Sequence, residues 1–188
     1  MFGVEALLAL SMVVSANAAQ PAPHAAWQER GIKALSPEQI EDYLKGRGMG
    51  MALPAELNGY PGPLHVLELA DELGLTADQR AQTERLFEDM RRRAIELGAQ
   101  IVEREALLDE IFQSATASEA PLRDAALALG RLSGELRAHH LTYHLAMRDL
   151  LDPRQLAAYQ RLRGYAAGPP RGHGRGHPGH GGHDGVAR

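Results

Sequence analysis

The longest uninterrupted helical pattern runs from Thr76 to Gln113, and it limits what this chain can fold into. The segment contains no Pro, and its single glycine, Gly98, is expected to be tolerated. At 1.5 Å per residue, an unbroken helix of this length measures roughly 55 Å. Its apolar residues recur at steps of three, four and seven, the spacing of one helix face: Leu86, Met90, Ala94, Leu97, Ile101, Leu108 and Ile111.

A second long helix follows a turn of small residues at 114–120. We expect it to begin at Pro121, because Pro is favoured in the first turn of a helix. No stretch shows sustained period-two alternation, so the predicted fold class is all-α, a long antiparallel helical hairpin with short flanking helices. Such a hairpin cannot bury both apolar faces alone. We therefore expect a crossed or cradle-like homodimer, or a larger homo-oligomer. The apolar stripe of the second helix consists of Leu122, Leu129, Leu132, Leu136, Tyr143, Met147 and Leu150.

The chain begins with a pattern typical of a signal peptide. The apolar run Phe2 to Val14 is followed by Ala16-Asn17-Ala18, a small-x-small cleavage pattern. We expect residues 1–18 to be removed on export and the mature chain to be soluble. No Lys or Arg precedes the apolar run, and a start codon further upstream would explain this.

The rest of the chain divides into three regions by composition. The first is an N-terminal arm and Gly/Pro-rich connection with a short helix near 36–45. The second is a helical domain that opens with a short helix over 64–73. The third is a tail without apolar content, which is expected to be disordered. The predicted boundaries are 19–63, 64–165 and 166–188.

Composition restricts the chemistry. With 20 Lys and Arg against 24 Asp and Glu, the chain has a formal charge of −4, which argues against a protein that coats nucleic acid. It has nine His and no Cys, so a transition metal would have to be held by His, Met and carboxylates. Signatures of a nucleophile elbow, a phosphate loop and a zinc-protease helix are absent, and Leu141 stands where the last of these needs Glu. We expect no enzymatic activity.

Three predicted helix starts share one pattern. Each has Leu, a capping side chain, two further residues and then Gln, which is a capping box preceded by an apolar residue. The three segments are Leu35 to Gln39, Leu75 to Gln79 and Leu151 to Gln155.

The last two of these motifs bracket the predicted hairpin, and here the chain resembles the Spy/CpxP/ZraP superfamily of periplasmic proteins with LTxxQ motifs, over about residues 60–165. Its members include heavy-metal sensors such as CnrX. The resemblance implies a periplasmic, all-α hooked hairpin, usually a dimer. It also implies one of two functions. Some relatives are ATP-independent chaperones that hold unfolding periplasmic proteins. Others bind a divalent metal and either signal to a membrane sensor protein or buffer the ion.

His140 and His144 are the main metal-ligand candidates, because a spacing of four residues on a helix points both rings in one direction. The resemblance carries a ligand pair onto these two residues. Met147 follows on the same side with a soft thioether. Alternatively, both histidines border the apolar stripe and simply bond to nearby carbonyls or carboxylates. Relatives complete such a site from the first helix, where this chain offers His65, Glu68 and Glu72 but has Leu69 in place of a second His.

Weaker candidates lie elsewhere. Met49 and Met51, in the Gly-rich loop, are possible Cu(I) contacts. Arg91, Arg92 and Arg93 form either a solvated face paired with Glu88 and Asp89 or a basic surface for acidic unfolding clients. The tail histidines form either an auxiliary metal site or part of a solubilising tail, and they are His173, His177, His180 and His183.

The sequence thus favours a periplasmic metal-binding protein of the heavy-metal sensor or resistance type. Zn, Cu, Ni and Co all remain open as the ion. Two alternatives need no metal: an ATP-independent chaperone, and a regulatory partner of a membrane sensor protein in the envelope-stress response.

Overall fold

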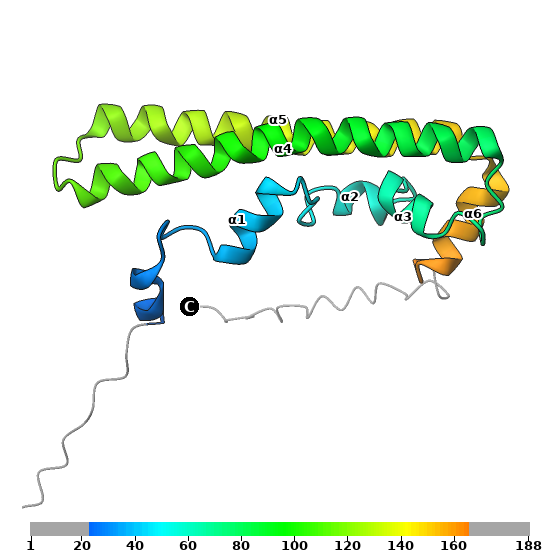
Figure 1. The fold of residues 1–188 in the computed structure, drawn as a ribbon, viewed down its shortest axis with the longest axis horizontal. Helices are drawn as coiled ribbons and strands as arrows, with labels where there is room; N and C mark the ends of the chain where they lie inside the picture. The colour runs from blue at the N-terminus through cyan, green and yellow to red at the C-terminus, as the bar shows by residue number, and fades with distance from the viewer. Residues whose placement is uncertain (1–22, 166–188) are drawn as a thin grey trace, which may run out of the picture.

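The computed structural model describes residues 23–165, and within them all regular structure is helical, which confirms the predicted fold class. Two long antiparallel helices form a hairpin, and the N-terminal segments run along one side of it (Figure 1). The last helix folds back beneath the end of the hairpin opposite its turn. In chain order the elements are η1 Ala25–Glu29, α1 Pro37–Leu44, α2 Leu53–Glu56, α3 Pro63–Glu68, α4 Ala77–Gln113, α5 Glu119–Leu150 and α6 Pro153–Leu162.

The long helices begin and end close to the predicted positions. Helix α4 spans 37 residues, starting at the Thr76 cap and ending at Gln113 as expected. Helix α5 begins at Glu119, two residues before Pro121, which therefore lies in its first turn. The apolar face between them forms one core cluster, which we call the hairpin cluster: Ala94, Leu97, Ile101, Leu129 and Leu136.

A second core cluster lies at the end of the hairpin where α3 and α6 meet α5. We call it the base cluster, and its buried members are Val66, Leu73, Met147, Leu151 and Tyr159. Tyr159 and Met147 are fully buried, with no exposed surface. Packing at this end fixes the angle at which α6 turns back.

All three predicted capping boxes are present, at Ser36, Thr76 and Asp152. Two of them are joined. Nε2 of Gln79 donates to Oε1 of Gln155 at 2.8 Å, and Nε2 of Gln155 donates to Oε1 of Gln79 at 2.9 Å. Gln79 also donates to the carbonyl of Leu150 at 3.1 Å. The repeated motif therefore caps α4 and α6 and ties the two caps together.

Gly98 is required by packing, contrary to the expectation that it is merely tolerated. The end of α1 crosses α4 at this point, and a Cβ atom on Gly98 would lie 2.2 Å from the carbonyl oxygen of Tyr43. Any larger residue would push α1 away from α4.

Three other segments differ from the predictions. Helix α3 ends at Glu68 rather than near 73, and turns occupy residues 69–74. The Gly/Pro connection (residues 46–63) contains the single-turn helix α2. In the N-terminal arm, residues 25–29 form the short 3₁₀ helix η1.

The predicted signal peptide, 1–18, and the tail with its four histidines lie outside the described residues. Within residues 23–165 no helix is both long and apolar enough to cross a membrane.

Candidate functional site

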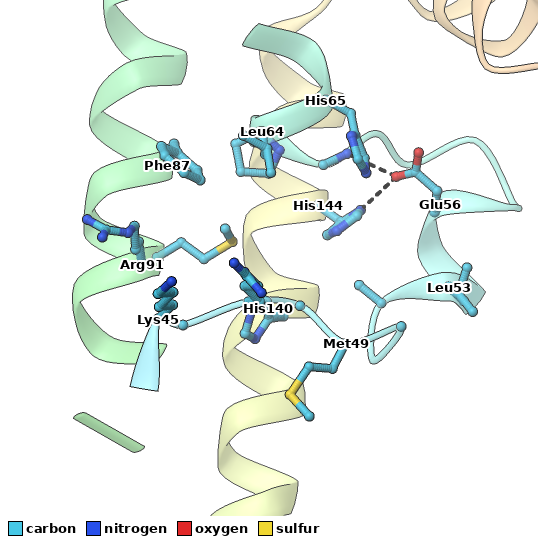
Figure 2. A pocket seen from close by; sticks show the side chains of 18 of the residues that line it. Lys45, Met49, Leu53, Glu56, Leu64, His65, Phe87, Arg91, His140 and His144 are labelled. Carbon is cyan, nitrogen blue, oxygen red and sulfur yellow. Dashed lines mark hydrogen bonds and ion pairs between the residues drawn. The ribbon is translucent and has the colours of Figure 1, made fainter. Parts of the chain in front are cut away.

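A cavity of about 530 Å³ separates the Gly/Pro connection from α4 and α5. Figure 2 shows His140 and His144 on successive turns of α5, Glu56 beside His144, and Phe87 and Arg91 on α4. The cavity walls are largely apolar, and two of the predicted metal ligands, His140 and His144, are among them.

His140 is almost completely buried, with 2% of its surface exposed. Its Nδ1 lies 3.0 Å from the carbonyl oxygen of Leu136, one turn back on α5. A carbonyl can only accept, so Nδ1 carries the proton and Nε2 has a free lone pair. That Nε2 is buried and has no hydrogen-bond partner among the described residues. Burial lowers the pKa of His140, which keeps the ring neutral.

His144 is held in the same way. Its Nδ1 lies 2.8 Å from the carbonyl oxygen of Tyr60, in the Gly/Pro connection, so Nδ1 again donates and Nε2 keeps the lone pair. Oε2 of Glu56 lies 3.8 Å from the same Nδ1. Metal-binding histidines are usually oriented by this type of carbonyl or carboxylate partner on the second nitrogen.

The connection passes close to both rings. A Cβ atom on Gly62 would lie 3.0 Å from Cε1 and 3.1 Å from Nε2 of His144, so a side chain there would crowd the ring. A Cβ atom on Gly48 would lie 3.7 Å from Cδ2 and 3.9 Å from Nε2 of His140, which is an ordinary van der Waals contact. Glycine is therefore needed for close packing at Gly62.

Glu56 is the centre of a buried polar network that the sequence did not reveal. It is 5% exposed. Its Oε1 accepts from the hydroxyl of Tyr159 and lies 3.5 Å from Nε of Arg163, and its Oε2 accepts from the amide of Gly62 at 3.2 Å. Burial and the neighbouring carboxylate raise the pKa of Tyr159, so its hydroxyl stays protonated and donates. The network links the connection to α6 directly behind His144.

His65 lies at the rim of the cavity, about one third exposed, with Nδ1 2.8 Å from Oε2 of Glu68. Glu72 is exposed in the turns after α3. Among residues 23–165, no group of three or more His, Asp or Glu side chains is arranged to hold an ion. The structure therefore brings His140 and His144 to one cavity but does not gather His65, Glu68 and Glu72 around them, and their role as ligands stays a prediction.

The methionines separate into two groups. Met147 is fully buried in the base cluster, and Met51 packs against the hairpin cluster. Met49 and Met90 instead line the cavity. Met49 stands in the left-handed region at φ 47°, a strained conformation for a residue with a side chain.

The neighbouring His139 is not among the cavity residues, and its Nε2 lies 3.0 Å from the carbonyl oxygen of Met90. In the run of three arginines on α4, each is paired with a carboxylate three residues away rather than four: Arg91 with Glu88, Arg92 with Asp89 and Arg93 with Glu96. Their pairing favours a solvated face, with Arg91 also at the cavity.

Comparisons with protein families, with curated proteins and with solved structures found no match for this chain. The function therefore has to be inferred from the cavity and from the sequence motifs.

Proposed function

We propose that this protein is an exported, periplasmic metal-binding protein of the heavy-metal sensor or resistance type, which binds a transition-metal ion through Nε2 of His140 and His144. One observation carries the proposal. Each ring donates Nδ1–H to a backbone carbonyl, which leaves both Nε2 lone pairs available on one wall of a cavity.

The unpartnered Nε2 of His140 supports this assignment. A buried polar atom without a hydrogen bond costs about 1–3 kcal/mol, so such atoms are rare unless they have a function or an unseen partner. A neutral imidazole with an open nitrogen is the form that binds Zn, Cu, Ni and Co. The loop at Gly48 covers this atom, so an ion entering the cavity would displace that loop.

Metal titration of the purified protein tests the proposal. To remove competing binding, the four tail histidines are first changed to Asn. We expect this protein to bind one ion, and the double variant His140→Ala/His144→Ala to lose that binding. His139→Ala is the matched control, because His139 lies on the same helix but bonds to the carbonyl of Met90. Unchanged binding by the double variant would refute the proposal.

A second candidate is an ATP-independent chaperone. Four leucines on or beside the connection are strongly exposed, and exposed apolar side chains suit apolar segments of unfolding clients. They are Leu44, Leu53, Leu57 and Leu64, between 43% and 56% exposed. In this case the protein should suppress aggregation of an unfolding client without ATP or metal. No suppression at several-fold molar excess would exclude this function.

A further inference from the structure

We infer that the thioethers of Met49 and Met90 complete the metal site, so that the cavity takes a soft monovalent ion, Cu(I) or Ag(I). This inference rests on the proposed binding at His140 and His144 and specifies its ion. It depends on the donor atoms in the cavity lining that are not already engaged in hydrogen bonds or ion pairs.

The oxygen donors near the two histidines are engaged elsewhere. The only carboxylate in the cavity lining is Glu56, and it already receives the hydroxyl of Tyr159 and the amide of Gly62, with Arg163 close by. The carboxylate of Glu68 is bonded to His65. A divalent ion such as Zn²⁺ usually takes four protein donors, or three and one water, and among residues 23–165 no three His, Asp or Glu side chains are arranged to hold an ion.

Apart from His65 at the rim and the hydroxyl of Tyr165, which accepts from Arg163, the remaining donors in the lining are two sulfurs. Met90 is 7% exposed and reaches the cavity from α4, opposite the histidines of α5. Met49 lies on the loop that covers Nε2 of His140, next to Gly48 (Figure 2). A methionine at φ 47° is costly where Gly would be free of strain, so its side chain has a use in that place.

Thioethers and imidazoles together suit Cu(I), which is stable with few ligands, whereas hard or borderline divalent ions prefer oxygen and additional nitrogen.

Silver ion tests the inference, because it has the ligand preferences of Cu(I) and does not change oxidation state in air. Ag(I) affinity is measured by competition with a coloured chelator, on the full chain with its four tail histidines changed to Asn. We expect Met49→Leu and Met90→Leu each to weaken Ag(I) binding on the order of tenfold or more. Zn²⁺ binding by the same variants should be weak and unchanged.

Leu nearly preserves the volume of Met, so the variants should keep their fold, which a thermal melt monitors. Met51→Leu is the matched control, since Met51 lies in the same loop but packs against the hairpin cluster. Wild-type Ag(I) affinity in Met49→Leu/Met90→Leu would overturn the inference. If His140→Ala/His144→Ala loses Ag(I) binding while the methionine double variant keeps it, the proposed function stands and only the inference fails. If the histidine double variant also keeps Ag(I) binding, both are refuted.

Discussion

His140 is a titratable base enclosed by apolar walls. Its surroundings stabilise the neutral ring through burial and through the positive charge that His139 and His144 would bring, while the carbonyl of Leu136 and the backbone of Gly46 act in the opposite direction. The folded protein therefore resists protonation of this ring, and the unfolded chain does not. Because the pKa of His140 differs between the folded and unfolded states, the free energy of unfolding depends on pH.

We predict that the metal-free protein loses stability as pH falls. The unfolded His140 takes up a proton near its ordinary pKa of 6.5, whereas the folded pKa is lower. Between the two values the unfolded state binds more protons, so the free energy of unfolding rises with pH. The contribution is complete above the unfolded pKa and is lost as pH falls through the folded one. Urea unfolding with a chelator present, from pH 7.5 to 5, should show a shallower dependence in His140→Gln. An equal dependence in both proteins would contradict this.

The sequence predicted part of the site at this scale. Helical spacing placed His140 and His144 on one border of an apolar stripe, and it offered a carbonyl partner and a metal as alternatives. The structure provides the carbonyl partners and still leaves Nε2 open. Glu56 was missed because it lies among Gly and Pro, where no periodic pattern distinguishes a buried carboxylate from an exposed one. No helix is predicted at residues 53–56, and α2 is in any case too short to show a periodic face.

Among the elements, α4 is the helix against which α1, α3 and α5 all pack. The sequence defined its start, its end and its apolar face, because capping and periodicity are local properties. It did not show that α1 crosses it at Gly98, because a close approach of two backbones depends on residues far apart in the chain.

We predict that Gly98→Ala destabilises the protein by about 1–3 kcal/mol, since the new methyl group overlaps the carbonyl of Tyr43. Helix propensity alone would give the opposite sign, a gain of up to about 1 kcal/mol. Gly130→Ala is the matched control, because no atom lies within 4 Å of its added Cβ and α5 is helical there. Chemical denaturation separates the two. A stabilised Gly98→Ala variant would mean that α1 does not pack at this crossing.

The amide pair between the caps of α4 and α6 gives a second prediction for the elements. Gln79 and Gln155 bond to each other and to their own caps, so we expect their contributions to be coupled. In a double-mutant cycle with Gln79→Ala and Gln155→Ala, the coupling energy should be about 0.5–3 kcal/mol. Additive losses would show that each glutamine serves only its own cap.

Residues 23–165 form an elongated hairpin with the N-terminal segments along one side (Figure 1), and α5 carries exposed apolar residues. Leu127 and Leu145 on α5 are 59% and 55% exposed. They are separated by eighteen residues, which is five whole turns at about 3.6 residues per turn, so they point the same way. Between them on this face lie Gly134, Ala138 and Leu141, together with the exposed Arg131. A surface of this kind is suited to a second copy of the chain.

We therefore predict that light scattering of the purified protein gives twice the mass of one chain. Leu127→Glu combined with Leu145→Glu should dissociate the dimer, because each charge would be buried at the contact. Leu162→Glu on α6 is the control, as Leu162 is also exposed but lies off this face. A wild-type protein that is monomeric at tens of micromolar would contradict the prediction.

The cavity also interrupts the core. On α5 the two histidines lie between Leu136 of the hairpin cluster and Met147 of the base cluster, and on α4 the cavity residues Phe87 and Met90 precede Ala94. The section of the hairpin around the cavity therefore lies between the two core clusters and belongs to neither. An occupant that joins the two walls would stiffen that section. Binding in the cavity would then change the bending stiffness of the hairpin, even if no atom at either end of the hairpin moved.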